Sequence, residues 1–108
     1  MTTPYVMIFC TVPDAATAKK ISQILVEEKL AACCNIVPGL NSIYSWENKI
    51  QDETELLLII KSRQELFPEL EQRIKKLHPY SVPEIIAIPI FNGNIDYLKW
   101  MEENVKKS

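Results

Sequence analysis

The chain has 108 residues, of which 47% are hydrophobic and 24% charged, so it can bury the core of one globular domain and is too apolar to be disordered. Its 12 basic and 14 acidic residues give a net charge of −2, and no lysine or arginine run exceeds two residues, which argues against a nucleic-acid partner. No apolar run approaches the roughly 20 residues that cross a bilayer, and the N-terminus lacks a secretory signal. We expect a single domain over residues 1–108, located in the cytoplasm and without a membrane partner.

The N-terminal part of the chain predicts a strand followed by a helix. Residues 5–12 are apolar throughout and rich in β-branched side chains, which is typical of a buried strand. Asp14 is placed to cap a helix from Ala15 to Lys29, in which apolar side chains recur at three- and four-residue spacing.

A long hairpin is predicted next. Residues 30–50 form its first strand, bent at Pro38 and Gly39, where a backbone N–H is missing and glycine permits unusual torsion angles. Residues 54–62 form its second strand. The turn is expected at 47–49, because asparagine tolerates the left-handed conformation of tight hairpin turns.

The second helix is predicted from a capping pattern. Ser62 and Glu65 have the S-x-x-E spacing of a capping box, and apolar residues then follow at helical spacing up to residue 77. Pro68 breaks the local rule for a helix interior, so it is expected in the first turn or at a kink.

The C-terminal part of the chain predicts a corner, a strand and a short helix. Two prolines make residues 78–83 a stiff, extended corner, because the residue before a proline is excluded from the helical basin. Residues 84–90 form the last main strand. Residues 92–94 then supply a turn and a helix cap.

This order of elements is the α+β ferredoxin-like βαββαβ arrangement with a long hairpin and a C-terminal helix. Residues 6–10, 56–60 and 85–90 are apolar at odd and even positions alike, so both faces of the sheet are expected to be buried. Because two helices cover only one face, we expect another copy of the chain to cover the second, in an obligate homo-oligomer. Tyr44 and Trp46 on the hairpin either anchor this interface or pack on their own domain.

The three cysteines do not form a recognisable motif. An odd number with one adjacent pair does not fit a secreted disulfide framework, so we expect free thiols in a reducing compartment. Cys33 and Cys34 point to opposite faces of a strand and cannot easily share an ion. Cys10 and Cys33 are either small buried hydrophobes or ligands, and the sequence does not decide whether Cys34 is reactive.

The corner and the start of the strand that follows it hold three further candidates for a binding role. His78, the single histidine, either ends a helix and hydrogen-bonds its last carbonyls or acts as a ligand. Glu84 opens an apolar strand, so its carboxylate must be paired, exposed or placed in a cleft between subunits. Tyr80 lies between His78 and Glu84 in the sequence.

Motifs for catalysis are missing from the sequence. A single histidine without a G-x-S-x-G motif does not indicate a hydrolase, and two glycines are too few for a P-loop or a dinucleotide-binding fingerprint. The three carboxylates of residues 51–55 (QDETE) would allow general acid–base catalysis, but the run is interpreted as a solvated hairpin surface. We expect a protein that is not an enzyme and has no organic cofactor.

Several separate blocks of the sequence resemble the CutA divalent-cation tolerance proteins and occur in the same order as in that family. They are FCTVPD (9–14), EKLAACCNIVPG (28–39), SIYSWENKI (42–50), HPYSVPEIIAIPI (78–90) and GNIDYLKW (93–100). The resemblance covers nearly the full length. It implies a ferredoxin-like subunit, a compact homotrimer, and association with copper or another divalent cation.

The resemblance also implies a set of metal ligands. The copper ligands described for bacterial members correspond to Cys10 and His78, and Cys33 matches the cysteine of the LAAC block. Thiolate and imidazole are ligands that Cu(I) prefers. The chain departs from the family pattern at Cys34 and at Ser81, where the family often has an acidic residue, and the loss of that acid weakens a metal site at the corner.

Two functions follow as hypotheses. The first is a trimeric protein that binds copper or another divalent cation and contributes to metal tolerance. The second is a trimeric signalling or scaffold module, by analogy of fold with the PII proteins, that binds a small metabolite or a partner protein. Its clefts between subunits would be lined by Trp46, Tyr80 and Glu84.

Overall fold

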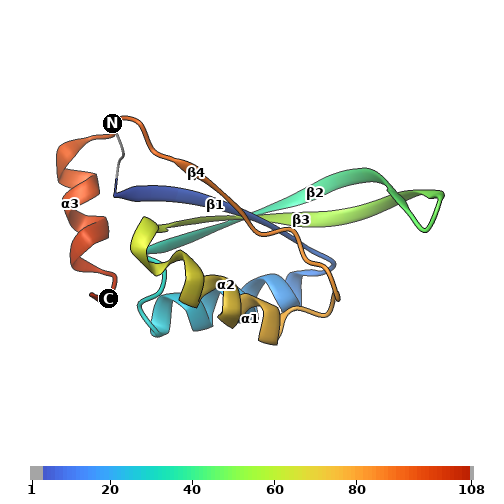
Figure 1. Ribbon diagram of the computed structural model, residues 1–108, viewed down its shortest axis with the longest axis horizontal. Coiled ribbons are helices and arrows are strands. Elements are labelled where there is room, and N and C mark those ends of the chain that lie inside the picture. Colours follow the sequence, from blue (N-terminus) through green and yellow to red (C-terminus); the bar gives the residue numbers. More distant parts are fainter. Residues whose placement is uncertain (1–3, 108) are drawn as a thin grey trace.

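The computed structural model describes residues 4–107, so both ends of the expected domain, residues 1–3 and 108, lie outside it. Its four strands form one antiparallel sheet in the order β2-β3-β1-β4, and two helices pack on one face (Figure 1). The predicted ferredoxin-like class is confirmed. In chain order the elements are β1 (Tyr5–Val12), α1 (Ala15–Glu27), β2 (Cys33–Trp46), β3 (Lys49–Arg63), the 3-10 turn η1 (Gln64–Leu66), α2 (Phe67–Leu77), β4 (Ile86–Pro89) and α3 (Ile95–Glu103).

The main core lies between the sheet and the helices α1 and α2. Alternate residues of β1 point into it and are at most 5% exposed, namely Val6, Ile8, Cys10 and Val12. They pack with Leu58 and Ile60 of β3, with Ile21 and Leu25 of α1, and with Leu70 and Ile74 of α2. Burial of each large aliphatic side chain contributes about 1.5–3 kcal/mol, so this layer fixes how the helices sit on the sheet.

Helix α1 begins where the sequence predicts and ends slightly earlier. The side chain of Asp14 accepts a 2.7 Å hydrogen bond from the N–H of Thr17, and this bond lowers the pKa of the Asp14 carboxyl. The helix ends at Glu27 because Lys29 adopts a left-handed conformation with φ of 58°, and Leu30 then donates back to Leu25.

The start of α2 differs from the prediction. The capping box is wrong, because Ser62 lies within β3 and its hydroxyl donates to the carbonyl of Leu30 at 2.6 Å. Glu65 instead forms an ion pair with Arg63 at 3.1 Å. The turn η1 leads into the helix, and Pro68 lies in its first turn as predicted.

The hairpin of β2 and β3 is longer than the rest of the sheet. Residues 56–63 of β3 pair with β1, whereas residues 49–55 pair only with β2, so the distal half projects away from the core (Figure 1). Glu47 and Asn48 form a two-residue turn in which both φ angles are positive, at 51° and 64°. This turn lies within the predicted range, and its twist matches that of the strands.

The predicted bend at Pro38 and Gly39 is a β-bulge. These two residues lie opposite one residue of β3, between the pairs Val37–Leu57 and Leu40–Glu55, and Gly39 has φ of +80°. The extra residue shifts the alternation of β2 side chains between the two faces by one position. Beyond the bulge, even-numbered residues of β2 share a face with odd-numbered residues of β3.

On the sheet face away from α1 and α2, apolar side chains of β3, β1 and β4 lie side by side, as predicted. Phe9 lies between Ile59 and Ile86 in the register, and Ile88 lies beside Met7. Ile86 and Ile88 remain 52% and 41% exposed. We refer to these five residues as the outer face.

The helices are short compared with the roughly 20 apolar residues that a bilayer requires. Within residues 4–107, no helix combines the length and the hydropathy needed to cross a membrane.

Candidate functional site

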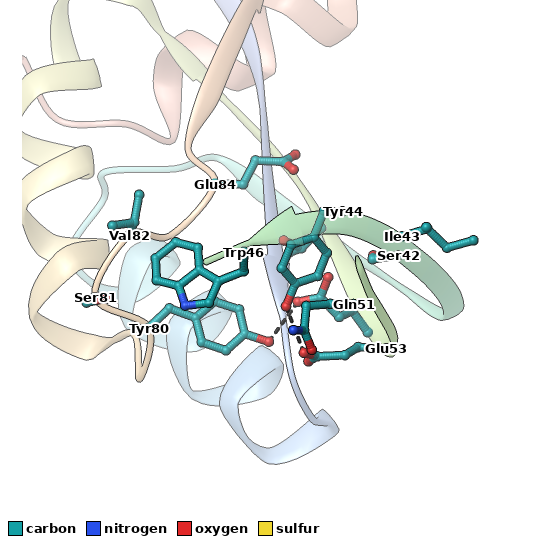
Figure 2. Close-up of a pocket in the computed structure, with 12 residues that line it drawn as sticks. Ser42, Ile43, Tyr44, Trp46, Gln51, Glu53, Tyr80, Ser81, Val82 and Glu84 are labelled. Atoms are coloured by element: carbon teal, nitrogen blue, oxygen red, sulfur yellow. Dashed lines mark hydrogen bonds between the residues drawn. The ribbon is translucent and has the colours of Figure 1, made fainter. Parts of the chain in front are cut away.

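A pocket of about 690 Å³ lies where the hairpin meets the corner between α2 and β4 (Figure 2). Its lining combines three aromatic rings with three carboxylates, and no lysine or arginine of the described chain belongs to it. The hairpin contributes Ser42, Ile43, Tyr44, Trp46, Gln51, Glu53 and Glu55, the corner contributes Tyr80, Ser81, Val82 and Glu84, and β1 contributes Thr11. The predicted cleft residues Trp46, Tyr80 and Glu84 therefore line one pocket.

Two tyrosine–glutamate hydrogen bonds organise the pocket (Figure 2). The hydroxyl of Tyr80 donates to Oε2 of Glu55 at 2.7 Å, and the hydroxyl of Tyr44 donates to Oε1 of Glu53 at 2.7 Å. Burial, followed by the bond to Glu55, raises the pKa of Tyr80, and the bond to Glu53 raises the pKa of Tyr44. Both phenols therefore stay protonated at neutral pH and act as donors to the carboxylates.

His78 holds the corner that carries Tyr80. It is 7% exposed, its Nε2 lies 2.7 Å from the carbonyl oxygen of Thr11, and its Nδ1 accepts the backbone N–H of Tyr80 at 3.1 Å. Because a carbonyl only accepts, Nε2 carries the proton and Nδ1 offers its lone pair to Tyr80. His78 ends α2, but its ring bonds β1 rather than the last carbonyls of the helix. Neither ring nitrogen is free for a metal ion.

The three cysteines are free thiols that lie on two faces of the sheet. Cys10 and Cys34 pack into the main core, and burial raises the pKa of each thiol to about 12. Cys33 pairs with Lys61 in the register and points to the other face, where it is half-buried. Of the two expectations for Cys10, the small buried hydrophobe describes its position in the core.

The predicted metal ligands do not come together within one chain. Cys10 and Cys33 lie on opposite faces, and both ring nitrogens of His78 are already bonded. Across residues 4–107, no group of three or more histidine, cysteine, aspartate or glutamate side chains is arranged to hold a metal ion. A centre built from Cys10, Cys33 and His78 of a single copy is therefore not formed.

Sequence reasoning missed Glu55, the most buried acidic residue of the pocket. The run at 51–55 is interpreted above as a solvated surface, yet Glu55 is only 4% exposed. The error has a simple cause, because residues 51, 53 and 55 point to the pocket while Asp52 and Thr54 point away and are exposed. Strand alternation within the run is the signal that separates the two sets.

The fold and this pocket together define a class, the ferredoxin-like α+β proteins with a projecting hairpin and a ligand-sized pocket between that hairpin and the corner. Within this class, the family model for the CutA1 divalent ion tolerance protein matches residues 6–104. The chain belongs to the CutA1 divalent ion tolerance protein family, as its sequence blocks predict.

Individual relatives agree with this assignment. The divalent-cation tolerance protein CutA of Thermus thermophilus is 52% identical over 98 residues, which cover 91% of this chain and 95% of that protein. A solved structure of the divalent cation tolerance protein (Cut A1) from the same species superposes with a TM-score of 0.92 at 50% identity, covering 94% of this chain and 99% of that one. The crystal structure of CutA1 from Oryza sativa gives a TM-score of 0.95 at 45% identity, with 99% and 98% covered. The chloroplastic CutA 1 protein of Oryza sativa is 45% identical over 107 residues, and this chain spans 60% of its length.

Proposed function

We propose that the protein contributes to tolerance of divalent cations as a homotrimer that binds copper, without catalysing a reaction. The tolerance role rests on membership of the CutA1 family. The observation that carries the proposed binding mode is the position of Cys33, on the side of the sheet that another copy would cover. We place the protein in the cytoplasm, where its three free thiols would stay reduced.

The outer face supports the oligomer. Its side chains form an apolar patch across β3, β1 and the edge strand β4, where Ile86 and Ile88 are half-exposed. Exposed apolar patches of this kind mark sites of association, and identical copies normally close into a symmetric ring. We take three as the number of copies from the resemblance to the CutA proteins.

Cys33 is the predicted ligand whose geometry leaves it available. The Cys10 thiol is buried and protonated, and the ring of His78 is bonded on both sides. By contrast, Cys33 is half-buried, and its Sγ makes only a long 3.7 Å contact with Oδ1 of Asn35. Copies arranged around an axis would contribute equivalent thiolates, which are the ligands that Cu(I) prefers.

The structural hydrogen bonds of His78 support binding rather than catalysis. A nucleophilic enzyme needs a base beside the nucleophile, and imidazole usually serves that purpose. Here both ring nitrogens of His78 tie the corner to β1 and to Tyr80, so the ring is a structural group.

Native mass spectrometry of the reduced, metal-stripped protein, titrated anaerobically with Cu(I), tests this proposal. One spectrum gives both the number of chains in the assembly and the number of copper ions bound. We expect a trimer that takes up a fixed number of ions. Cys33→Ala should remove this uptake, whereas Cys34→Ala, a matched change of the adjacent thiol on the other face, should retain it. Graded uptake without saturation, or equal behaviour of the two variants, would contradict the proposal.

A further inference from the structure

We propose that the pocket between the distal half of the hairpin and the corner binds a small organic cation of the ammonium or guanidinium class. This site is separate from the proposed copper site, because no cysteine or histidine of the described residues lines it. A buried carboxylate without a cationic partner, three aromatic rings and the size of the pocket point to such a ligand.

Glu55 is the central group of this site. It is 4% exposed, and within residues 4–107 the hydrogen bond from Tyr80 is the one hydrogen bond or ion pair of its side chain. Among the described residues, this largely buried carboxylate has one neutral donor and no cationic partner to compensate its charge. A cation bound in the pocket would supply the missing positive charge, since Glu55 lines the pocket.

The surroundings of Glu55 add negative charge rather than neutralise it. Glu53 and Glu84 line the same pocket, and neither forms an ion pair with a described residue. Lys49 lies opposite Trp46 near the tip of the hairpin, but it does not belong to the lining. The field of Glu55 and Glu53 also helps to raise the pKa of Tyr80. The pocket is therefore an uncompensated acidic cavity.

The aromatic residues favour an organic cation over a metal ion. Figure 2 shows the rings of Tyr44, Trp46 and Tyr80 grouped at the pocket together with the carboxylate of Glu53. Aromatic faces attract weakly hydrated cations such as alkylammonium and guanidinium groups, whereas a hydrated divalent ion needs clustered oxygen ligands. No such cluster occurs in the part of the chain that the structure describes.

The size of the pocket favours a free small molecule over a single side chain of a neighbouring copy. Its volume of about 690 Å³ falls within the range of roughly 300–1,000 Å³ that is usual for small-molecule sites. One lysine or arginine head group from another subunit would leave most of this space unfilled.

The two tryptophans of the chain allow a direct test, because Trp46 lines the pocket and Trp100 lies on α3. Nitrogen-15 NMR spectra of the intact oligomer would follow both indole N–H signals during titration with n-butylammonium, n-butylguanidinium or the neutral n-butanol. We expect either cation to shift the Trp46 signal to saturation, with no matching effect of n-butanol and no shift of Trp100.

Charge-neutral variants complete the test. Glu55→Gln keeps an acceptor for Tyr80 and should weaken cation binding about tenfold or more, as expected for loss of a buried charge partner. The matched control is Asp52→Asn, which removes the same charge from the opposite face of β3 and should leave affinity unchanged. If Glu55→Gln fails to fold, Glu84→Gln at an exposed position should weaken binding severalfold.

Three results would overturn the proposal. The first is an equal response to n-butanol and to both cations. The second is unchanged affinity in Glu55→Gln. The third is a structure of the assembled protein in which a basic side chain of a neighbouring copy fills the pocket.

Discussion

The phenol of Tyr80 donates a 2.7 Å hydrogen bond to the carboxylate of Glu55, which ties the corner after α2 to the base of the hairpin. The backbone of Tyr80 is held in turn by Nδ1 of His78, whose Nε2 donates to Thr11 in β1. One series of contacts therefore links β1, the corner and β3. The geometry of the pocket depends on this series.

Removal of the Tyr80 hydroxyl should destabilise the protein. Tyr80→Phe leaves the buried Glu55 without its hydrogen bond, and an unsatisfied buried acceptor costs about 1–3 kcal/mol. Denaturant unfolding at fixed protein concentration measures the loss, since an oligomer's stability depends on concentration.

The matched control for this change is Tyr44→Phe. Its partner Glu53 is exposed and can bond water instead, so the loss of stability should be much smaller. Equal losses in the two variants would show that the bond to Glu55 has no special structural role.

Replacement of the histidine should affect stability and spare copper uptake. His78→Ala removes two hydrogen bonds that join the corner to β1 and to Tyr80, so we expect a loss of about 2 kcal/mol or more. The folded variant should bind as much Cu(I) as the parent in native mass spectra. Loss of copper uptake in a folded trimer would instead identify the imidazole as a ligand.

Stability should fall in alkaline solution. Burial raises the pKa of Cys10 from 9.0 to about 12, and burial together with Glu55 raises the pKa of Tyr80 above 10.0. The folded state therefore holds these protons more tightly than the unfolded state. This contribution to stability is complete below the unfolded pKa values and is lost as pH rises through the folded ones.

Denaturant unfolding between about pH 8 and pH 11 checks this expectation. The free energy of unfolding should decrease across the range, and the decrease should be shallower in Cys10→Ala, which lacks one of the shifted groups. If the free energy of unfolding falls equally steeply with pH in the variant and the parent, the Cys10 thiol ionises equally in the folded and unfolded states.

A charge on the outer face should prevent assembly. Ile88→Glu places a carboxylate in the apolar patch, and desolvating it at an interface is unfavourable. Val26→Glu on α1 is the matched control, because Val26 and Ile88 are each 41% exposed. Sedimentation velocity should show a trimer for the parent and for Val26→Glu but not for Ile88→Glu. A stable trimer of Ile88→Glu would place the interface elsewhere.

Local patterns were sufficient to predict most of the fold. The apolar run of β1, the cap at Asp14, the bend at Gly39 and the turn at Asn48 each follow from the torsion angles or hydrogen bonds that their residue types favour. The position of the hairpin and the order of the elements follow from these signals together.

Features that depend on distant contacts could not be predicted in this way. Ser62 has the spacing of a capping residue, but the carbonyl of Leu30 competes for its hydroxyl from across the fold. The ring of His78 is bonded to Thr11, 67 positions earlier in the chain. Glu55 is covered by Tyr80 of the returning corner, a distant contact that the pattern of charges in residues 51–55 does not reveal.

Anomalous scattering from crystals of the Cu(I)-loaded oligomer tests the central proposal most directly, because it locates the metal without assuming its ligands. We predict a copper peak beside Sγ of Cys33, shared by thiolates of more than one copy in a trimer. A peak beside His78 or Cys10, or no ordered copper in a saturated protein, would contradict the proposed mode of metal binding.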